Sequence, residues 1–525
     1  MHESYFGMDT KSKDLSERSA ALDKRDFIKL AGMSAAYALV SGAPSIARSQ
    51  TVPHEAIVRM SLIEGVRALA SGKITSQAYC EAALAQADKF KGYNIFTQTS
   101  PTYVREAAAS VDALRQEGKA AGSLRGAPFA LKDSIDMVEY YTMSGHPALQ
   151  NFEPLVDADL VKLYREANGI CIGKTQLAPL SLWWTTENPL TGDTGNPFNK
   201  AYKTGGSSGG SGAAVAARIV PFAVAEDTLG SVRVPAALNG VQGFRPTTGR
   251  WPTVGTMPQG FTDTLGPIAR TVADIKWLDT LSAVDHPQNR PSTISLLSVR
   301  IGYQKHGFLQ ELHPWVEENF EQTLRTLSRA GATLVEIKDL PGAESFQIAG
   351  KMLMADFPGA VARYFNRHRV YDRSVFGLLH QLHVDVLKKN NLQLLDQSVV
   401  GEGYFDLVVQ LMEARQRYKD IMSANRIDAL LYPTTKAPNT PNDGAETLVG
   451  KGPRGEPIAE FSFGANMILA PAMKTPSLAL FSGLDRAGLP LSITLDGYSD
   501  QDRRLLDIAE AVEKVLPPVV EPKSI

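Results

Sequence analysis

Two serine-containing segments and one lysine carry the residue types in this 525-residue chain that could do covalent chemistry. The first segment, Thr204–Ala217, begins Thr-Gly-Gly-Ser-Ser-Gly-Gly-Ser-Gly and continues into an alanine-rich stretch that favours a helix. The second, Asp227–Ala236, contains Ser231, and Lys132 ends an apolar, strand-like run upstream of both. Glycines permit unusual backbone angles, and a helix N-terminus presents free N–H groups. The pattern predicts a site where hydroxyl groups and backbone donors meet.

Three other interpretations of the glycine- and serine-rich segment fit less well. A phosphate-binding loop needs Gly-Lys-Ser/Thr at its end, and here Gly210 is followed by Ser211. The dinucleotide fingerprint fails because the required Gly-x-Gly-x-x-Gly does not open on a strand with an acidic residue to follow. A flexible linker is disfavoured because a strong helix follows at once and apolar segments lie on both sides.

A serine hydroxyl is a poor nucleophile until a base accepts its proton. None of the nine histidines lies in these motifs, and the nearest is His146. A lysine can replace histidine where burial lowers its pKa, because desolvation disfavours the charged amine. Taken singly, each serine is better interpreted as a loop residue and Lys132 as a surface lysine, but the three motifs together favour catalysis.

In their order and spacing these motifs resemble the amidase signature family, over about residues 55–515. Further segments agree with it: Lys132-Asp133, Asn188–Pro197, Gly243–Thr247, Asp263–Pro267 and Gly488–Pro490. The resemblance implies an α/β fold with a large twisted mixed β-sheet covered by helices on both faces. It also implies hydrolysis of carboxylic amide C–N bonds in small aryl, aliphatic or fatty amides, with no metal and no cofactor.

The resemblance assigns the catalytic roles. Ser231 is the nucleophile that forms an acyl-enzyme, and Ser207, which follows a cis peptide bond in the family, connects it to Lys132, the neutral base. Protons then pass from Ser231 through Ser207 to Lys132 and later to the leaving amine. The expected oxyanion hole is formed by the backbone N–H groups of Thr228, Leu229, Gly230 and Ser231.

Supporting roles fall on Ser208, on Asp227, which can hold the loop by accepting N–H bonds, and on Arg233, which we interpret as a structural ion-pair partner. Leu229 replaces a glycine that is usual in the family, and a leucine at positive φ would be strained. Its side chain can also reshape the acyl pocket, so we expect an unusual substrate preference.

Three residues are candidates for the lining of the substrate pocket. Ser181, Trp183 and Trp184 lie where the family lines its acyl pocket, although buried aromatic residues more often belong to the core. A carbamate or ester hydrolase with the same triad stays open as an alternative. So does a glutaminase-type amidotransferase subunit, against which the departures at Thr204 and Ala178-Pro179 argue.

Short apolar runs that alternate with helical patterns independently favour an α/β fold with a central sheet. The expected strands are residues 127–131, 169–172, 220–225, 300–303, 332–337, 428–432, 478–481 and 491–495. We expect one amidase domain over residues 49–525, with a mainly helical insertion around 345–425 that either walls a pocket or forms an outer layer. Cys80 and Cys171 are expected to be small buried residues, with a single bridge between them open.

The N-terminal 48 residues predict a disordered leader followed by an export signal. Lys24-Arg25 begins a basic segment that resembles a twin-arginine signal, an apolar run follows at 30–40, and Ser45–Ala47 supplies a small-residue cleavage site. We therefore expect a periplasmic protein, or a cytoplasmic one if the signal is not used, with no stable membrane span after signal removal. The net charge of −2 disfavours nucleic acid as a partner, and a homodimer is possible alongside the small amide substrate.

Overall fold

The computed structural model describes residues 52–119, 121–257, 260–285, 293–305, 307–341, 343–371, 377–378, 403–442, 448–451, 457–459 and 463–525. All of them belong to the unit Thr51–Ile525. The predicted leader and export signal lie outside the described residues. Among the described helices, none is both long enough and apolar enough to cross a bilayer.

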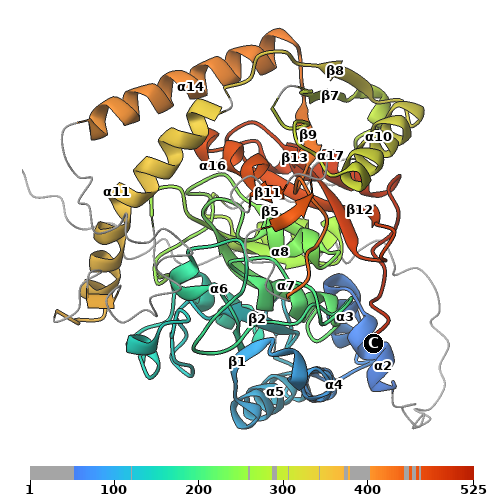
Figure 1. The fold of residues 1–525 in the computed structure, drawn as a ribbon. Coiled ribbons are helices and arrows are strands. Elements are labelled where there is room, and N and C mark those ends of the chain that lie inside the picture. Colours follow the sequence, from blue (N-terminus) through green and yellow to red (C-terminus); the bar gives the residue numbers. More distant parts are fainter. Residues whose placement is uncertain are drawn as a thin grey trace, which may run out of the picture. The chain divides into compact units, whose positions relative to one another are not determined.

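A mixed, 11-stranded sheet runs through the described part of the chain (Figure 1). Its order is β1-β3-β2-β4-β6-β5-β12-β13-β9-β7-β8, and a separate pair is formed by β10 and β11. The strands are β1 (Phe96–Thr99), β2 (Pro128–Lys132), β3 (Ile170–Thr175), β4 (Phe222–Asp227), β5 (Gln242–Arg245), β6 (Thr264–Ala269), β7 (Arg300–Tyr303), β8 (Thr333–Glu336), β9 (Ala429–Pro433), β10 (Leu448–Lys451), β11 (Pro457–Ala459), β12 (Ser477–Leu484) and β13 (Pro490–Asp496).

Two parallel blocks lie on either side of an antiparallel centre. Strands β3, β2 and β4 are mutually parallel, as are β9, β7 and β8, and the pairs between β4 and β9 are antiparallel. Parallel neighbours need a helical crossover, and antiparallel neighbours need only a turn or a short connection. The large mixed sheet of the predicted α/β fold is thereby confirmed.

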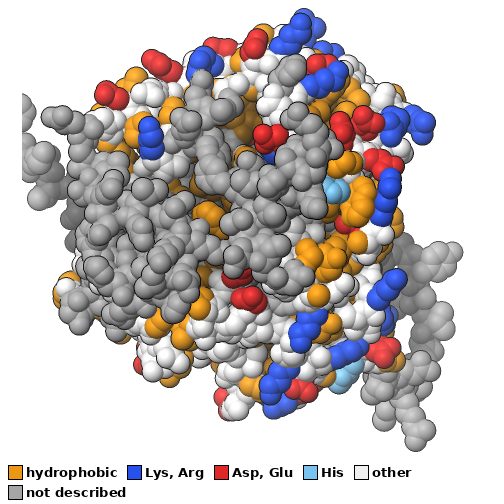
Figure 2. All heavy atoms as spheres, in the orientation of Figure 1, with side chains coloured by type: hydrophobic (Ala, Val, Ile, Leu, Met, Phe, Trp, Pro, Cys, Tyr) orange, Lys and Arg blue, Asp and Glu red, His pale blue; other side chains and the backbone are white. Residues whose placement is uncertain are grey.

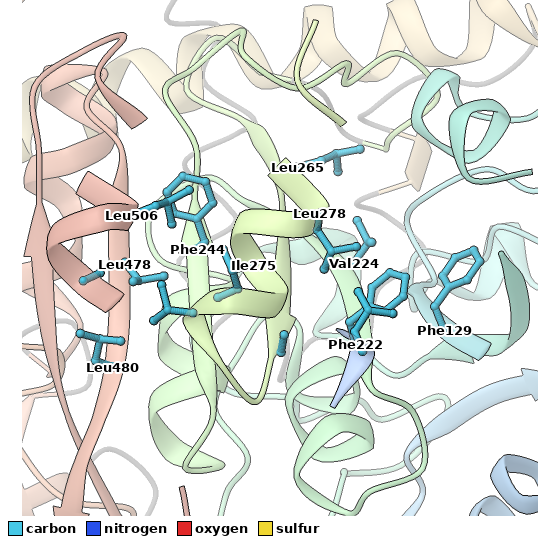
Figure 3. Packing of buried hydrophobic residues seen from close by; sticks show 14 of the residues in the cluster. Phe129, Phe222, Val224, Phe244, Leu265, Ile275, Leu278, Leu478, Leu480 and Leu506 are labelled. Atoms are coloured by element: carbon cyan, nitrogen blue, oxygen red, sulfur yellow. The ribbon is translucent and has the colours of Figure 1, made fainter. Parts of the chain in front are cut away.

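Strand β4 shows why both faces of the sheet are covered. Phe222 and Val224 pack with Phe129 of β2 on one face, whereas Ala223 and Ala225 pack on the other. Successive residues of a strand point to opposite faces, so a strand that is apolar along its length is buried on both. Helices α9 (Val272–Ser282) and α17 (Asp502–Glu513) contribute to the first cluster (Figure 3). Helices α4 (Ser76–Lys89), α5 (Pro101–Gln116) and α7 (Gly209–Ala216) contribute to the second.

Val58, Leu62, Val66 and Leu69 recur at the spacing of one helix, but the segment forms two helices. Helix α2 (His54–Arg59) ends before Met60, and α3 (Leu62–Ala70) begins after Ser61. The Ser61 hydroxyl accepts from the Glu64 N–H at 3.2 Å, and the Glu64 carboxylate accepts from the Ser61 N–H at 2.8 Å. This capping box starts a new helix where apolar spacing alone predicts continuity.

The remaining α-helices are α6 (Asp159–Glu166), α8 (Arg233–Leu238), α10 (Pro314–Arg329), α11 (Ala343–Arg367), α14 (Tyr404–Ala424) and α16 (Leu469–Met473). Figure 1 shows the long helices α11 and α14 next to each other on one side of the molecule. They lie in the stretch where we expect a helical insertion, of which residues 372–376 and 379–402 fall outside the described part.

Helix α11 is tied to the loop that follows β2 through a buried carboxylate. Asp136 accepts a hydrogen bond from Tyr364 at 2.7 Å, and its other oxygen lies 2.8 Å from Nε2 of His368. All three side chains are buried. Cys80 and Cys171 are also buried, and neither forms a disulfide.

Surface charges do not cluster by sign on the face drawn in Figure 2, where acidic and basic side chains are interspersed around the described part. Exposed ion pairs such as Arg105 with Glu81 contribute little to stability, because water and salt screen them. The polar groups that matter for chemistry are therefore the buried ones.

Candidate active site

The carboxyl ends of two parallel strands bring the predicted groups together. Lys132 is the last residue of β2, and Glu226 and Asp227 end the adjacent strand β4, where Val224 lies opposite Leu131. Helix α7 begins at the same edge, since the Gly210 N–H donates to the Gln176 carbonyl just after β3. In open α/β sheets this edge is where functional groups gather.

Lys132 lies between a serine and a carboxylate. Its Nζ is 2.6 Å from Oγ of Ser207 and 2.7 Å from Oε1 of Glu226, and both the lysine and glutamate side chains are almost fully buried. Burial lowers the pKa of Lys132, because desolvation penalises the ammonium, and the nearby charge of Glu226 opposes that shift. The amine therefore sits where it can gain or lose a proton.

The glycine-rich loop allows Ser207 to approach this close. The peptide bond between Gly206 and Ser207 is cis. A Cβ on Gly206 would lie 2.5 Å from the backbone of Thr185, and one on Gly210 would lie 2.5 Å from the backbone of Gln176. Side chains at either glycine would displace the loop from the sheet edge and carry Ser207 away from Lys132.

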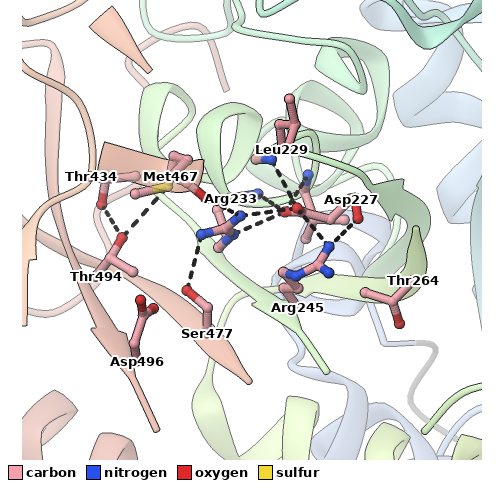
Figure 4. A network of polar contacts seen from close by, with 12 residues as sticks. Asp227, Leu229, Arg233, Arg245, Thr264, Thr434, Met467, Ser477, Thr494 and Asp496 are labelled. Atoms are coloured by element: carbon pink, nitrogen blue, oxygen red, sulfur yellow. Dashed lines mark hydrogen bonds and ion pairs between the residues drawn. The ribbon is translucent and has the colours of Figure 1, made fainter. Parts of the chain in front are cut away.

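An ionic cluster around Asp227 holds the loop that contains Ser231. Figure 4 shows Asp227 with Arg233 and Arg245 beside Leu229 of that loop. Asp227 accepts from the backbone N–H of Gly230 at 2.8 Å and of Val232 at 3.2 Å. Both of its oxygens also accept from the Arg233 guanidinium at 3.0 Å, and Arg245 adds a further contact at 3.2 Å. Although burial alone would raise it, the pKa of Asp227 is held well below its ordinary value by the two arginines.

Arg233 in turn connects this loop to the other side of the site. It donates to the Met467 carbonyl at 2.8 Å and to the Ser477 hydroxyl at 3.1 Å. Ser231, only 5% exposed, thus has its backbone fixed from two directions. The arrangement fixes the backbone of Ser231 on the loop that leaves β4, the strand whose end carries the partner of Lys132. Nucleophilic catalysis by a serine requires such a serine and a base within reach of each other.

Comparison with known proteins agrees with this geometry. The sequence model of the family described as Amidase matches residues 78–506. The chain belongs to the amidase family. It is a hydrolase of amide C–N bonds, in line with the resemblance that its motifs show.

Individual amidases are similar over nearly the whole chain. Mandelamide hydrolase of Pseudomonas putida is 30% identical over 486 residues, which cover 88% of this chain and 92% of that protein. Indoleacetamide hydrolase of Agrobacterium vitis is 31% identical, with 83% and 92% covered. The native peptide amidase of Stenotrophomonas maltophilia superposes with a TM-score of 0.76 at 25% identity, over 90% of this chain and 99% of that one.

One donor of the predicted oxyanion hole has a partner within its own loop. The N–H of Gly230 donates to Asp227 at 2.8 Å. Thr228, Leu229, Gly230 and Ser231 stay the predicted backbone donors to a developing oxyanion. The residue with positive φ in this loop is Gly230, at 125°, and not Leu229. The backbone of Leu229 is therefore not strained in the way considered from the sequence.

The residues predicted to line the pocket have different surroundings. Trp184 is buried, packs in a core cluster with Met467, and donates from Nε1 to the Leu229 carbonyl at 3.2 Å. Trp183 is half-buried, with its ring centroid 6.4 Å from that of Trp184. The core interpretation of Trp184 is therefore supported by packing, and its indole also fixes the backbone of the oxyanion loop.

The hydroxyl groups of Ser181 and Ser208 have different surroundings. Ser181 lies in the left-handed region at φ 60°, and its hydroxyl donates to Oε1 of Glu226. Ser208, at the N-cap of α7, has a buried hydroxyl for which the structure shows no partner. Ser181 thus faces the carboxylate beside Lys132 rather than a purely apolar pocket.

Glu226, which contacts the candidate base, is a site residue that sequence reasoning missed. It lies directly before the Asp227 motif, at the end of an apolar run that we expect to be a strand. A signal was present, because a buried lysine at the end of one parallel strand needs an acidic partner, and the end of a neighbouring strand is the nearest place for it. Among the described residues, no group of three or more His, Cys, Asp and Glu side chains is arranged to hold a metal ion.

Proposed function

We propose that the chain hydrolyses a small aryl-substituted carboxamide through an acyl-enzyme on Ser231. The observation that carries this proposal is the buried contact of 2.6 Å between Lys132 Nζ and Ser207 Oγ, on a chain of the amidase family. A lysine with a lowered pKa and a serine at hydrogen-bond distance form a base that can act at neutral pH.

The chemistry proceeds in two halves. Ser231 Oγ attacks the amide carbonyl while its proton passes to Ser207, and the proton of Ser207 passes to Lys132. The oxyanion is stabilised by backbone N–H groups of the loop from Thr228 to Ser231, and the C–N bond breaks as the proton returns to the leaving nitrogen. Water then repeats the sequence at the ester carbonyl and releases the acid.

The substrate class rests on relatives and on local composition. The relatives are named for mandelamide and indoleacetamide, both of which are primary amides of aryl-substituted acetic acids. Leu229 and Trp183 are both partly buried, and each can provide apolar contact for an aromatic acyl group. We therefore expect primary aryl-acetamides to be better substrates than aliphatic amides, carbamates or esters.

A hydrolysis panel tests the proposal. Primary amides, p-nitroanilides, carbamates, esters and L-glutamine are offered to the purified protein and to Ser231→Ala, Lys132→Ala and Ser211→Ala. The first two changes should lower kcat/KM on the best amide by about 10⁴-fold or more. Ser211 is the matched control, because its buried hydroxyl on α7 bonds to Thr175 at 2.7 Å, and its loss should cost less than about tenfold.

The outcomes separate the candidate functions. Activity on aryl-acetamides that depends on Ser231 and Lys132 supports the proposal. Preference for glutamine would point to a glutaminase-type subunit, and preference for a carbamate or ester would replace the substrate class. Activity that survives Ser231→Ala would rule out the acyl-enzyme.

We also propose export to the periplasm, on the basis of the basic pair Lys24-Arg25 and the apolar run that follows it. Expression of the full chain in a bacterium with both Sec and twin-arginine pathways, followed by fractionation and N-terminal sequencing, tests this. A periplasmic form that begins near Ser49 is expected. Full-length protein confined to the cytoplasm would contradict the proposal.

A further inference from the structure

Glu226, the carboxylate beside Lys132, is held in place by specific hydrogen bonds. Glu226 is 1% exposed and accepts from Lys132 at 2.7 Å and from Ser134 at 2.7 Å, and Ser181 donates to the same oxygen as Lys132. Leu180 and Ser181 are both left-handed non-glycine residues, a costly backbone that aims the Ser181 hydroxyl at the carboxylate. Three elements thus converge on one side chain.

Because Glu226 is so close, Lys132 and Glu226 together can act as the base, instead of Lys132 alone. An amine and a carboxyl group 2.7 Å apart share one proton, either as ammonium and carboxylate or as neutral amine and carboxylic acid. Both forms have the same net charge, so a buried site can interconvert them without exchanging a proton with water. A lone buried lysine would instead have to release its proton to solvent before it could act.

We propose that Glu226 is a positioning residue that holds Lys132 against Ser207 and takes up the proton that Lys132 receives during acylation. This inference rests on the proposed amide hydrolysis at Ser231. It makes the Lys132–Glu226 pair, rather than the lysine alone, the group whose proton count decides activity.

The protons balance as follows. When the Ser231 oxygen bonds to the carbonyl carbon, its proton moves to Ser207, the Ser207 proton moves to Lys132, and one ammonium proton moves to Glu226. Lys132 is then still an ammonium, and Glu226 is a neutral carboxylic acid. When the C–N bond breaks, one proton returns along the same path to the leaving nitrogen, and the ion pair is restored.

Other charged groups lie near the Lys132–Glu226 pair, and their effects on the pH profile have to be distinguished from those of the pair. Asp227 and Asp263 both act on Lys132, and Asp263 also lies near Arg245. Burial raises the pKa of Asp263 to about 6, and the charge of Glu226 adds to that shift. Asp263 therefore titrates in the range where an acid limb is measured, and it needs its own variant.

The test is the pH profile of kcat/KM for Glu226→Gln, with Glu226→Asp, Asp263→Asn and Glu513→Gln alongside. The amide of glutamine keeps the shape, and its carbonyl oxygen can accept from Lys132 and Ser181 as Oε1 does. Its NH2 group replaces the oxygen that accepts from Ser134, and it cannot take up the proton. Under the proposal the wild-type pair already holds one proton, and only a further proton inactivates it. In Glu226→Gln a single proton on Lys132 inactivates the site, so we expect activity to be lost at a higher pH.

We expect Glu226→Gln to move the acid limb upward by about one pH unit or more and to lower kcat at pH 7 by about 10- to 100-fold, with KM little changed. Glu226→Asp should restore the position of the limb. Asp263→Asn should leave the limb within about half a unit of the wild type. Glu513→Gln, a buried carboxyl on α17 with a pKa raised by burial to about 7, should not move it.

Two results would overturn the inference. A downward shift in Glu226→Gln would mean that the neutral lysine is the base and that Glu226 only stabilises its ammonium. An unshifted limb, with a lower rate in a protein of unchanged melting temperature, would mean that Glu226 only packs the site. The wild-type protein is measured in the same series. If the wild type itself hydrolysed no amide, the result would count against the proposed function and not against the role of Glu226.

Discussion

Two buried ion clusters lie one residue apart on strand β4 and differ in the cation that each contains. Glu226 pairs with Lys132, and Asp227 pairs with Arg233 and Arg245. Neighbouring residues of a strand point to opposite faces, so one strand end presents a carboxylate to each side. The first cluster contacts Ser207, and the second holds the backbone on which Ser231 lies.

The difference follows from the chemistry of the two cations. A guanidinium stays charged at any pH that a folded protein meets, and its planar fork binds a carboxylate through two parallel hydrogen bonds. Asp227 and Arg233 form such a fork, and it fixes a loop. An amine can lose its proton when buried, and burial lowers the pKa of Lys132. One cluster is suited to geometry and the other to proton transfer.

Replacement of each cation by the other type, in two separate variants, gives the largest expected effect on kcat/KM. Lys132→Arg keeps the charge and the pairing with Glu226 but cannot give up a proton, so kcat/KM should fall by about 10²- to 10⁴-fold. Arg233→Lys keeps a charge beside Asp227 but loses the fork, and kcat/KM should fall by less than about tenfold. Steady-state assays on the best amide check both, with melting temperatures as the control. Equal losses of kcat/KM in the two variants would show that the clusters do not differ in function, one in proton transfer and the other in loop geometry.

Removal of the carboxylate that faces the arginines should cost stability. Asp227→Asn removes the carboxylate that pairs with two buried guanidinium groups, and the free energy of unfolding should fall by about 3–5 kcal/mol. Chemical denaturation followed by fluorescence measures it. Asp279→Asn, which affects a buried pair with Arg250 remote in sequence from the catalytic motifs, is the matched control and should lower stability while kcat of the folded protein is retained. If Asp227→Asn were as stable as the wild type, the arginine cluster would not hold the fold.

A buried carboxyl group that forms no ion pair within the described part of the chain provides the third case. Glu513 accepts from the Val272 N–H and the Gln242 side chain at 3.0 Å, and burial raises its pKa to about 7. Because the folded-state pKa is raised above the unfolded value, its contribution is fully present below about pH 4.5 and is lost as pH rises towards 7. Glu513→Gln should reduce the loss of stability between pH 5 and 7.5 by about 1–3 kcal/mol.

Urea denaturation at the two pH values measures that difference. Glu317→Gln, a change in the first turn of α10, serves as the control and should leave the pH dependence as it is. An identical pH dependence in Glu513→Gln and the wild type would show that Glu513 is already ionised in the folded protein.

The smallest effect concerns the loop that the arginine cluster holds. Leu229 is partly buried against the cluster that contains Trp184 and Met467, and it follows Thr228 in the oxyanion loop. Leu229→Gly should change the ratio of kcat/KM between an aryl-acetamide and an aliphatic amide by about tenfold, since it removes apolar contact. Leu484→Gly, at an exposed leucine that ends β12, is the control. An unchanged ratio would place the Leu229 side chain outside the acyl pocket.

The sequence predicts the parallel strands of the fold better than its antiparallel centre. Strands β2 and β4 follow from short apolar runs, because strands that are buried on both faces are apolar along their length. Strands β5 and β6 pair in the middle of the sheet but contain Gly243, Arg245, Gly266 and Pro267, which interrupt any apolar pattern. Their motifs could be located but not their structure, since cross-strand packing compensates for weak local propensity.

For the site, motifs locate the three catalytic candidates but not the contacts between them. The pairing of Lys132 with Glu226 depends on the register of β2 against β4, which no local pattern contains. The engagement of the Gly230 N–H by Asp227 likewise depends on the turn that the folded loop adopts. Both features become visible only once the strands are aligned.

The central claim is that a buried Lys132–Ser207 contact activates Ser231, and covalent labelling tests it most directly. Wild type, Lys132→Arg and Ser207→Ala are incubated with a fluorophosphonate, and the adduct is followed by intact mass and located by peptide mapping. We predict a single adduct on Ser231 in the wild type, with labelling about 100-fold slower or more in both variants. An adduct on another serine, or a rate that neither change alters, would contradict the account.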